Sequence, residues 1–429
     1  IVACTMRSCT KTTLKNGLRI LTIPRKDDLA TTFLVLVEAG SKYETKEISG
    51  LSHFLEHMCF KGTEKRPKAI NIAGELDGLG AECNAFTTQE YTGYFAKVEA
   101  HKIDQALDIV SDLYLNPVFN AAEIEKEKGV VVEELNMYED LPMRKVNDLF
   151  MELLYGDQPA GWDIGGTKEV VKSLTKEQLF AYRTAHYVPQ ATVVVVAGAF
   201  NEAAMVQKIE AAFGGIPVGM KSGKLPVAET QTASRVYFKK KPIDQTHIML
   251  GCRAFSAFDE RRFALEVLGD ILGGGMSSRL FQKVREEMGA AYSVRAGADL
   301  FTDHGFLAVN AGIDQTKILQ VIAAILEEMQ KLKEELVPEA ELRRAKNHLV
   351  GRVILGLEAS DELASVYGAQ EVMGEALMSP QELVKKLEAV TPADIQSVAR
   401  DIFTDQRTNL AVIGPVGDEE VFKAALHFA

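Results

Sequence analysis

The sequence has few cysteines, and they follow no disulfide or metal-binding pattern. The 429-residue chain contains five, scattered along its length, and no two of them form a CxxC pair. A disulfide framework and a thiolate zinc site are therefore not indicated. A reducing compartment fits this cysteine usage best.

Long apolar runs are also missing. No stretch of about 18 apolar residues occurs, which excludes a conventional membrane span. The chain starts Ile-Val-Ala-Cys4 without a Met, which indicates a trimmed or incomplete chain. These four residues resemble the end of a bacterial lipoprotein signal, but the basic and apolar regions of such a signal do not precede them. We expect a cytoplasmic protein of bacterial type, and a periplasmic or lipid-anchored location stays an alternative.

The sequence has no excess of positive charge. It holds 48 Lys and Arg residues against 60 Asp and Glu residues, and its formal net charge is −12. Nonspecific attraction to nucleic acid or anionic lipid is therefore not expected. With 47% hydrophobic and 25% charged residues, the composition is that of an ordinary soluble globular protein, which excludes wholesale disorder and fibrous character.

The two halves of the sequence are similar. Thr175 and Thr391 each stand three residues before a polar side chain that can complete a helix cap. Each predicted helix leads to an apolar strand, at 191–198 in the first half and at 408–414 in the second. The two threonines are 216 residues apart, and so are the last residues of the two strands. Because half of the chain is about 214 residues, the sequence predicts an internal duplication.

The start of each half predicts strands. Residues 14–18 are typical of a hairpin turn, and 32–37 form an apolar run typical of a buried strand. In the second half, the equivalent runs are 236–238 and 247–250. Helices then alternate with strand pairs. We therefore predict an α+β fold with two homologous domains, each a mostly antiparallel sheet covered by helices.

A linker separates the two halves. Residues 214–226 are rich in Gly, Pro and Lys and show no apolar periodicity. We predict a catalytic domain at 1–215, a linker at 216–233 and a homologous non-catalytic domain at 234–429.

One short motif indicates metal chemistry. His53 and His57 enclose Glu56 in an H-x-x-E-H pattern, and apolar residues at 51, 54, 55 and 58 predict a helix that is buried on one side. On such a helix, residues four apart share a face about 6 Å apart along the axis, so the two imidazoles can bind one zinc ion. Glu56 lies beside them and can act as a general base toward water. The order is that of the inverted zincin motif. The alternative is a histidine pair without metal, although chance gives only about 0.02 such motifs in this composition.

The motif leaves one ligand position to fill, and an acidic helix further along the chain can fill it. Catalytic zinc sites commonly use a carboxylate there. Residues 123–135 are acidic, and an apolar run precedes Glu134, which favours a partly buried acid that needs a partner or a metal. Glu127 lies two helical turns earlier and shares the face of Glu134. The alternative, a solvated charged helix, suits Glu123 and Glu125 better than Glu134.

These motifs resemble the pitrilysin family of zinc peptidases, in particular its short processing-peptidase branch. The resemblance extends over nearly the whole chain and includes Phe60–Thr63, Asn84–Thr87, Glu90–Thr92, His186–Pro189, Gly275–Phe281 and Arg285–Tyr292. It implies that His53, His57 and Glu134 bind zinc. It also implies that Glu56 is the base and that Glu127 is a carboxylate supporting the ligands.

The resemblance gives roles to residues that their own pattern does not single out. It implies that Arg285 and Tyr292 bind substrate and stabilise the developing oxyanion, for which a guanidinium and a phenol are suitable donors. Without the resemblance, the favoured interpretation is that Arg285 is a surface residue and that Tyr292 lies at the edge of the core. The segment of Asn84, Ala85 and Phe86 resembles the edge strand of the family, to which substrate adds as a further strand.

The second half lacks the metal motif. Leu265, Leu268 and Gly269 align with the three residues of the zinc motif at an offset of 212, and Arg352 aligns with Glu134 at an offset of 218. A second metal site is therefore not expected.

A triglycine at Gly273–Gly275 occurs in the same half. It lacks the Lys-Ser/Thr of a P-loop and the GxGxxG spacing, so nucleotide binding is not indicated. It resembles a flexible glycine-rich loop of the family that engages substrate, but it is shorter than the loop of the mitochondrial non-catalytic subunit.

We predict a zinc endopeptidase that hydrolyses peptides or unfolded segments bound as an added strand in a closed chamber. A non-catalytic scaffold and a partner-dependent subunit of a processing-peptidase-like complex are the alternatives. Family members of this length resemble half of a four-domain clamshell. We therefore expect a homodimer in which Arg285 and Tyr292 of one protomer reach the zinc site of the other, with assembly within one chain as the alternative.

Overall fold

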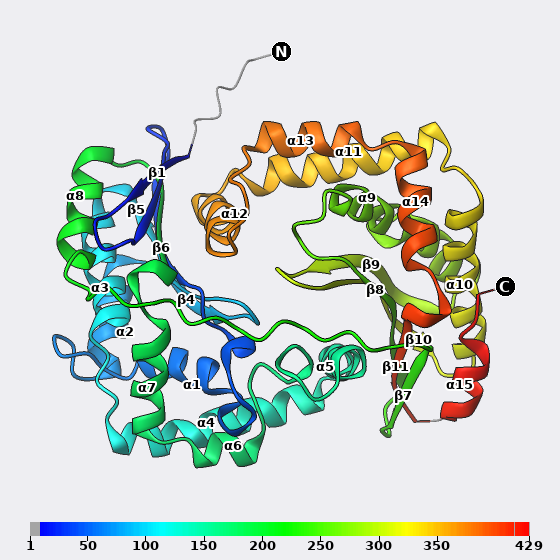
Figure 1. Cartoon of the computed structure of the whole chain (residues 1–429), viewed down its shortest axis with the longest axis horizontal. Helices are drawn as coiled ribbons and strands as arrows, with labels where there is room; N and C mark the ends of the chain where they lie inside the picture. Colours follow the sequence, from blue (N-terminus) through cyan, green and yellow to red (C-terminus); the bar gives the residue numbers. More distant parts are fainter. Residues whose placement is uncertain (1–8, 416, 429) are drawn as a thin grey trace. The chain divides into compact units, whose positions relative to one another are not determined.

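The computed structural model describes residues 9–415 and 417–428. Figure 1 shows its helices and strands, coloured along the sequence from blue to red. The segment around Cys4 lies outside the described residues. The chain divides into two compact units. The first unit contains the residues up to Leu135, Asp163–Leu225 and Ile354–Pro380. The second unit contains Asn136–Trp162, Pro226–Val353 and the residues from Gln381 onward.

The sheet of the first unit has six strands. Their order is β1 (Thr10–Thr13), β2 (Arg19–Pro24), β6 (Thr192–Gly198), β3 (Ala30–Val37), β5 (Thr92–Glu99) and β4 (Glu82–Thr87). The pair of β2 and β6 is parallel, and all other pairs are antiparallel. The predicted turn before β2 is present, with Gly17 at a φ of 94°.

Helices cover this sheet because both of its faces are apolar. The helices of the first unit are α1 (Leu51–Cys59), α2 (Ala69–Leu79), α3 (Ile103–Leu115), most of α4 (Ala121–Asp140), α6 (Lys168–Ser173), α7 (Lys176–His186), α8 (Glu202–Phe213) and α12 (Ser360–Val372). Along β3, Phe33 and Val35 face a large core that includes side chains of α1, α3, α7 and α8. Helix α12 packs on β3 and β6, where a Cβ at Gly368 would lie only 2.6 Å from Leu36 Cδ1.

The sheet of the second unit repeats this topology. Its order is β7 (Arg235–Lys240), β11 (Thr408–Gly414), β8 (Gln245–Ala254), β10 (Gly305–Asp314) and β9 (Ala291–Leu300). The pair of β7 and β11 is parallel and the other pairs are antiparallel, as for the corresponding strands of the first unit. The predicted fold class, with two homologous α+β domains and mostly antiparallel sheets, is confirmed.

Helices also pack on the sheet of the second unit. The helices of this unit are α5 (Pro142–Tyr155), α9 (Arg262–Gly273), a π-helix (Phe281–Glu287), α10 (Ile318–Glu334), most of α11 (Glu339–Gly356), most of α13 (Pro380–Ala389), α14 (Pro392–Ile402) and α15 (Glu419–Ala425). Short 3₁₀ turns lie at Ser41–Tyr43, Lys46–Ile48, Ala100–Lys102, Pro159–Gly161, Pro189–Ala191 and Asp405–Arg407. Thr175 at α7 and Thr391 at α14 both form capping boxes, with Gln178 and Asp394 respectively.

Each unit contains a segment from the other half of the sequence. Residues 136–162 belong to the second unit, where α5 packs on β8 and β11, and residues 354–380 with α12 belong to the first. The predicted division at 1–215 and 234–429 does not include this exchange. In the part of the chain that the structure describes, no helix is both long and apolar enough to cross a membrane.

Candidate metal centre

Helix α1 carries the histidine motif on a buried scaffold. Leu51, Phe54, Leu55 and Met58 are fully buried, as the apolar pattern predicts. The start of the helix is held by the carboxylate of Glu44, which accepts hydrogen bonds from the backbone N–H groups of residues 50 and 52 at 2.7 and 2.6 Å. Such acceptors satisfy N–H groups that have no partner within the helix. The position of the two histidines is therefore fixed by core packing and by this cap.

His53, His57 and Glu134 meet between α1 and α4. Glu134 Oε2 lies 3.7 Å from His53 Nε2 and 3.4 Å from His57 Nε2. One ligating atom from each residue lies within 4.8 Å of those of the other two. Ligand atoms about 2.1 Å from one tetrahedral zinc ion lie about 3.4 Å apart. The spacing and the chemistry of these three side chains therefore fit a zinc ion with an open fourth position.

Glu127 orients one of the histidines. Its side chain is almost fully buried, and Oε1 lies 3.0 Å from His57 Nδ1, while Oε2 lies 2.6 Å from Lys61 Nζ. Burial raises the pKa of Glu127, but the contacts with His57 and Lys61 outweigh burial and hold this pKa below its usual value. With Glu127 ionised, His57 donates its Nδ1 proton, so Nε2 is left to bind a metal. No sequence pattern indicates this role of Lys61, because its partner Glu127 lies 66 residues further along the chain.

Glu56 is held by a hydroxyl from the neighbouring strand. Its carboxyl group is nearly buried, and Thr87 Oγ1 donates a hydrogen bond to Glu56 Oε2 at 2.6 Å. Burial raises the pKa of Glu56, and the Thr87 hydrogen bond partly opposes this effect. Thr87 is the last residue of β4, so the contact joins the predicted edge strand to the predicted base. Thr87 belongs to the Asn84–Thr87 segment that resembles the family, but no sequence pattern indicates its contact with Glu56.

Strand β4 lies at the edge of its sheet. Among the strands that the structure describes, it pairs with β5 alone. Asn84 is exposed, Ala85 is buried, and Phe86 packs on Tyr91 with ring centroids 6.1 Å apart. The backbone groups on the outer side of β4 are therefore available to a further strand.

Arg285 and Tyr292 belong to the second unit. The structure brings them together, with the Arg285 guanidinium carbon 5.1 Å from the Tyr292 ring centroid and 4.8 Å from that of Phe281. Tyr292 is 77% exposed at the start of β9, so it is not a residue of the core edge. Its phenol is open to contact with another molecule or another part of the protein.

These observations define a class of protein. A duplicated α+β chain carries an H-x-x-E-H helix and a glutamate in zinc-binding geometry in one unit. In the residues that the structure describes, this is the single cluster of three or more potential metal ligands. Such a chain has the architecture and the site of an inverted zincin.

Comparison with known proteins gives the family. Residues 19–168 match the model described as insulinase (peptidase family M16), and residues 173–349 match the model of the peptidase M16 inactive domain. The chain belongs to peptidase family M16, which confirms the predicted relationship. The inactive-domain match includes residues 234–349 of the second half, which lacks the zinc motif.

Relatives of this chain carry the name of zinc protease. An uncharacterized zinc protease of Streptomyces coelicolor is 36% identical over 419 residues, which cover 96% of this chain and 90% of that protein. The uncharacterized zinc protease YmxG of Bacillus subtilis is 36% identical over 406 residues, covering 95% of this chain and 98% of that protein. These names support a zinc-dependent peptidase.

Solved structures show the same fold. A protease from Helicobacter pylori aligns with a TM-score of 0.88 at 21% identity, over 96% of this chain and 100% of that chain. A peptidase M16 inactive domain from Pseudomonas fluorescens aligns with a TM-score of 0.86 at 19% identity, over 96% of this chain and 100% of that chain. At these identities the likeness is one of fold alone.

Proposed function

We propose that this protein is a zinc-dependent endopeptidase that hydrolyses peptides or unfolded segments. The observation that carries the proposal is the cluster of His53, His57 and Glu134 with Glu56 beside it on the same helix. Zinc, when bound, supplies a Lewis acid that polarises a carbonyl group and acidifies water. The names of the relatives agree with this activity.

The residues of the chain supply the proton transfers. Glu56 accepts a proton from the attacking water as the water oxygen bonds to the carbonyl carbon of the substrate. The same carboxyl group then returns the proton to the nitrogen that leaves when the C–N bond breaks. Burial raises the pKa of Glu56, so its carboxyl group holds a proton more readily than an exposed glutamate does before it returns the proton to the nitrogen. Thr87 holds one carboxyl oxygen and leaves the other to carry the proton.

Recognition is assigned to the free edge of β4. An extended peptide that pairs with Asn84, Ala85 and Phe86 is held by its own backbone, which makes recognition tolerant of sequence. We place the charge-stabilising donors, Arg285 and Tyr292, in the second unit of a homodimer partner. This assembly rests on the duplicated units and on the division of motifs between them. A chamber between two protomers would admit extended peptides and exclude folded proteins.

A peptide library tests the proposed activity. The purified protein is incubated with the library with and without a chelator, and the products are identified by mass spectrometry. We expect internal cleavage that the chelator abolishes and zinc restores. A zinc-loaded protein that cleaves no peptide would identify a non-catalytic scaffold instead.

Two substitutions separate the base from a ligand. Glu56→Gln removes the proton acceptor without removing a ligand, so we expect loss of turnover by a factor of about 100 or more with zinc retained. Glu134→Gln removes a ligand, so both zinc content and turnover should fall. Metal analysis and peptide hydrolysis of both variants check this, and near-normal hydrolysis by Glu56→Gln would contradict the mechanism.

A further inference from the structure

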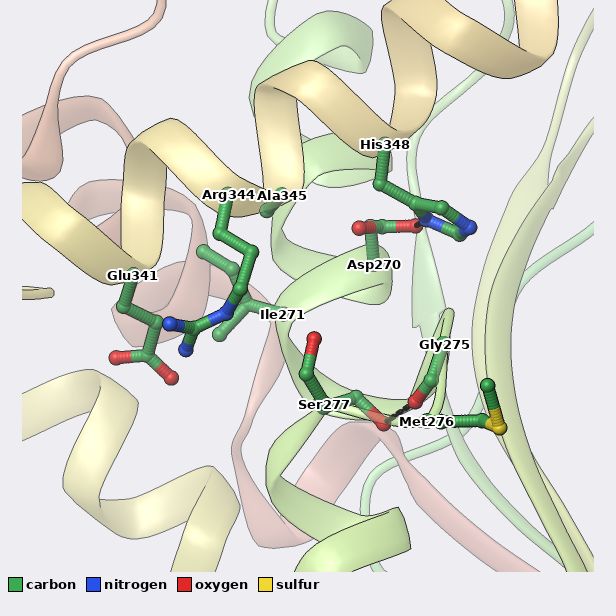
Figure 2. A pocket seen from close by; sticks show the side chains of 10 residues that line it. Asp270, Ile271, Gly275, Met276, Ser277, Glu341, Arg344, Ala345 and His348 are labelled. Carbon is green, nitrogen blue, oxygen red and sulfur yellow. Dashed lines mark hydrogen bonds and ion pairs between the residues drawn. The ribbon is translucent and has the colours of Figure 1, made fainter.

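A pocket lies in the second unit, between the end of α9 and one face of α11. Its volume is about 380 Å³. Four residues of α11 line it, namely Glu341, Arg344, Ala345 and His348. The last three follow Glu341 by three, four and seven residues, so all four lie on one face of the helix. In Figure 2, Arg344 and Glu341 extend from α11 on one side of the pocket, and His348 lies beside Asp270 on the other side.

This pocket occupies the place that the metal cluster has in the first unit. Helix α11 begins 218 residues after α4, and α9 is the counterpart of α1. Asp270 directly follows Gly269, the residue that aligns with His57. In the first unit, imidazoles on α1 meet carboxylates on α4, whereas here a carboxylate on α9 meets an imidazole on α11. Within the described residues, Asp270 and His348 belong to no cluster of three or more potential metal ligands.

The carboxylates of the pocket are already paired. Both oxygens of Glu341 accept hydrogen bonds from Arg279 at 2.9 Å. Asp270 Oδ1 lies 2.7 Å from His348 Nδ1. By contrast, Arg344 is exposed and forms no ion pair with any residue that the structure describes. The pocket therefore presents the Arg344 guanidinium beside two carboxylates that already have other partners, together with the ring of His348.

The end of α9, which leads into the loop opposite, is closely packed. A Cβ at Gly274 would lie 2.1 Å from Asp270 Oδ1, and one at Gly273 would lie 2.3 Å from the backbone N of Ala296. Ser278 Oγ also donates a hydrogen bond to the carbonyl of Gly275 at 2.6 Å. These glycines are required because the loop backbone lies against the Asp270 side chain and β9.

We propose that this pocket binds the carboxylate group of a peptide. Arg344 offers a planar pair of N–H donors that matches a carboxylate, and the hydroxyl of Ser277 lies on the opposite wall. Ile271, Ala345 and Met276 give apolar surface beside these donors, which suits an aliphatic chain that carries the charge. The carboxylate comes either from a chain terminus or from an acidic side chain. Binding here requires no hydrolysis, so the proposal stands apart from the proposed activity.

Fluorescence anisotropy tests the pocket directly. The protein is the zinc-loaded Glu56→Gln variant, which leaves the peptides intact. The probes are a fluorescein-labelled alanine pentapeptide with a free C-terminal carboxylate, its C-terminal amide, and the amide form with one Glu. We expect at least one of the two carboxylate peptides to bind about 10-fold more tightly than the plain amide. Comparison of the peptide with a free C-terminus and the amide peptide with one Glu shows whether the pocket binds a terminal carboxylate or an acidic side chain.

Two neighbouring arginines provide the matched variants. In the same Glu56→Gln background, Arg344→Gln should weaken binding of the carboxylate peptide about 10-fold and leave binding of the amide peptide unchanged. Arg343→Gln removes an exposed guanidinium from the same helix outside the pocket, so it should change little. Equal affinity for carboxylate and amide, or equal losses in the two variants, would overturn the proposal. Thermal melting of both variants shows that each stays folded.

Discussion

Glu56, the residue proposed to move protons, is held by one hydroxyl from another element. Thr87→Val keeps the shape of the side chain but removes the donor, and a hydrogen bond to a charged group contributes about 1.5–3 kcal/mol. We expect kcat to fall about 10-fold or more while zinc content stays unchanged. Thr87→Ser should restore most of kcat because it restores the donor. Equal losses in the two variants would show that packing of the strand end, and not the hydrogen bond, matters.

A buried histidine should make the first unit sensitive to acid. Burial lowers the pKa of His186 to about 4, and its ring packs on Tyr182 with centroids 4.2 Å apart. Below a pH of about 6.5 the unfolded chain binds a proton that the folded chain does not bind, so stability falls as the pH decreases toward 4. Between pH 7 and 5, the loss is about 2 kcal/mol.

Urea denaturation of His186→Phe checks this pH dependence. The variant keeps an aromatic ring but cannot bind a proton, so its stability should change less between pH 7 and 5 than that of the parent protein. His101→Gln is the control, because the His101 side chain is 74% exposed. Parallel pH profiles for the parent and His186→Phe proteins would contradict the expectation.

At the scale of an element, the start of α1 depends on a glycine. Gly50 has a φ of 93°, and a Cβ there would lie 2.4 Å from the carbonyl oxygen of Gly165. Gly50→Ala should therefore destabilise the first unit by more than 2 kcal/mol and reduce zinc binding, because strain and a backbone clash add. Gly80→Ala is the control, since Gly80 has a φ of 65° but open space around it. It should cost only about 1 kcal/mol. Denaturation and metal analysis of the two variants measure the difference.

Local elements were predictable from the sequence because their signals are local. The 3.6-residue period identified α1, and the seven-residue spacing placed Glu127 and Glu134 on one face of α4. The contacts of Lys61 and Thr87 were not predictable, because their partners lie on other elements. Nor was the exchange of α5 and α12, since an amphipathic helix pattern does not indicate which sheet the helix will cover.

At the scale of the whole molecule, the two units keep one sheet topology but differ in the chemistry between their helices. The first unit places His53, His57 and Glu134 between α1 and α4. The second places the Asp270–His348 pair between α9 and α11, and it also carries Arg285 and Tyr292. A duplicated fold thus supplies two helix pairs, of which one holds the predicted metal ligands. The roles proposed for Arg285 and Tyr292 therefore require both units for a complete active site.

Subunit complementation distinguishes a site shared between chains from a site within one chain. Inactive Glu56→Gln protein is mixed with inactive Arg285→Ala protein under conditions of subunit exchange. In a mixed homodimer with shared sites, the intact Glu56 of one protomer meets the intact Arg285 of the other. Equal mixing then makes half of the dimers mixed, each with one working site, so about one quarter of the parental activity should return.

The controls decide what a negative result means. Two different affinity tags show whether mixed dimers form, and a chain that carries both substitutions should rescue neither single variant when it is added in place of the other. If mixed dimers form and no activity returns, Arg285 acts on the zinc site of its own chain. Recovery close to one quarter requires that each protomer contributes its second unit to the site of its partner, because neither single variant contains both groups.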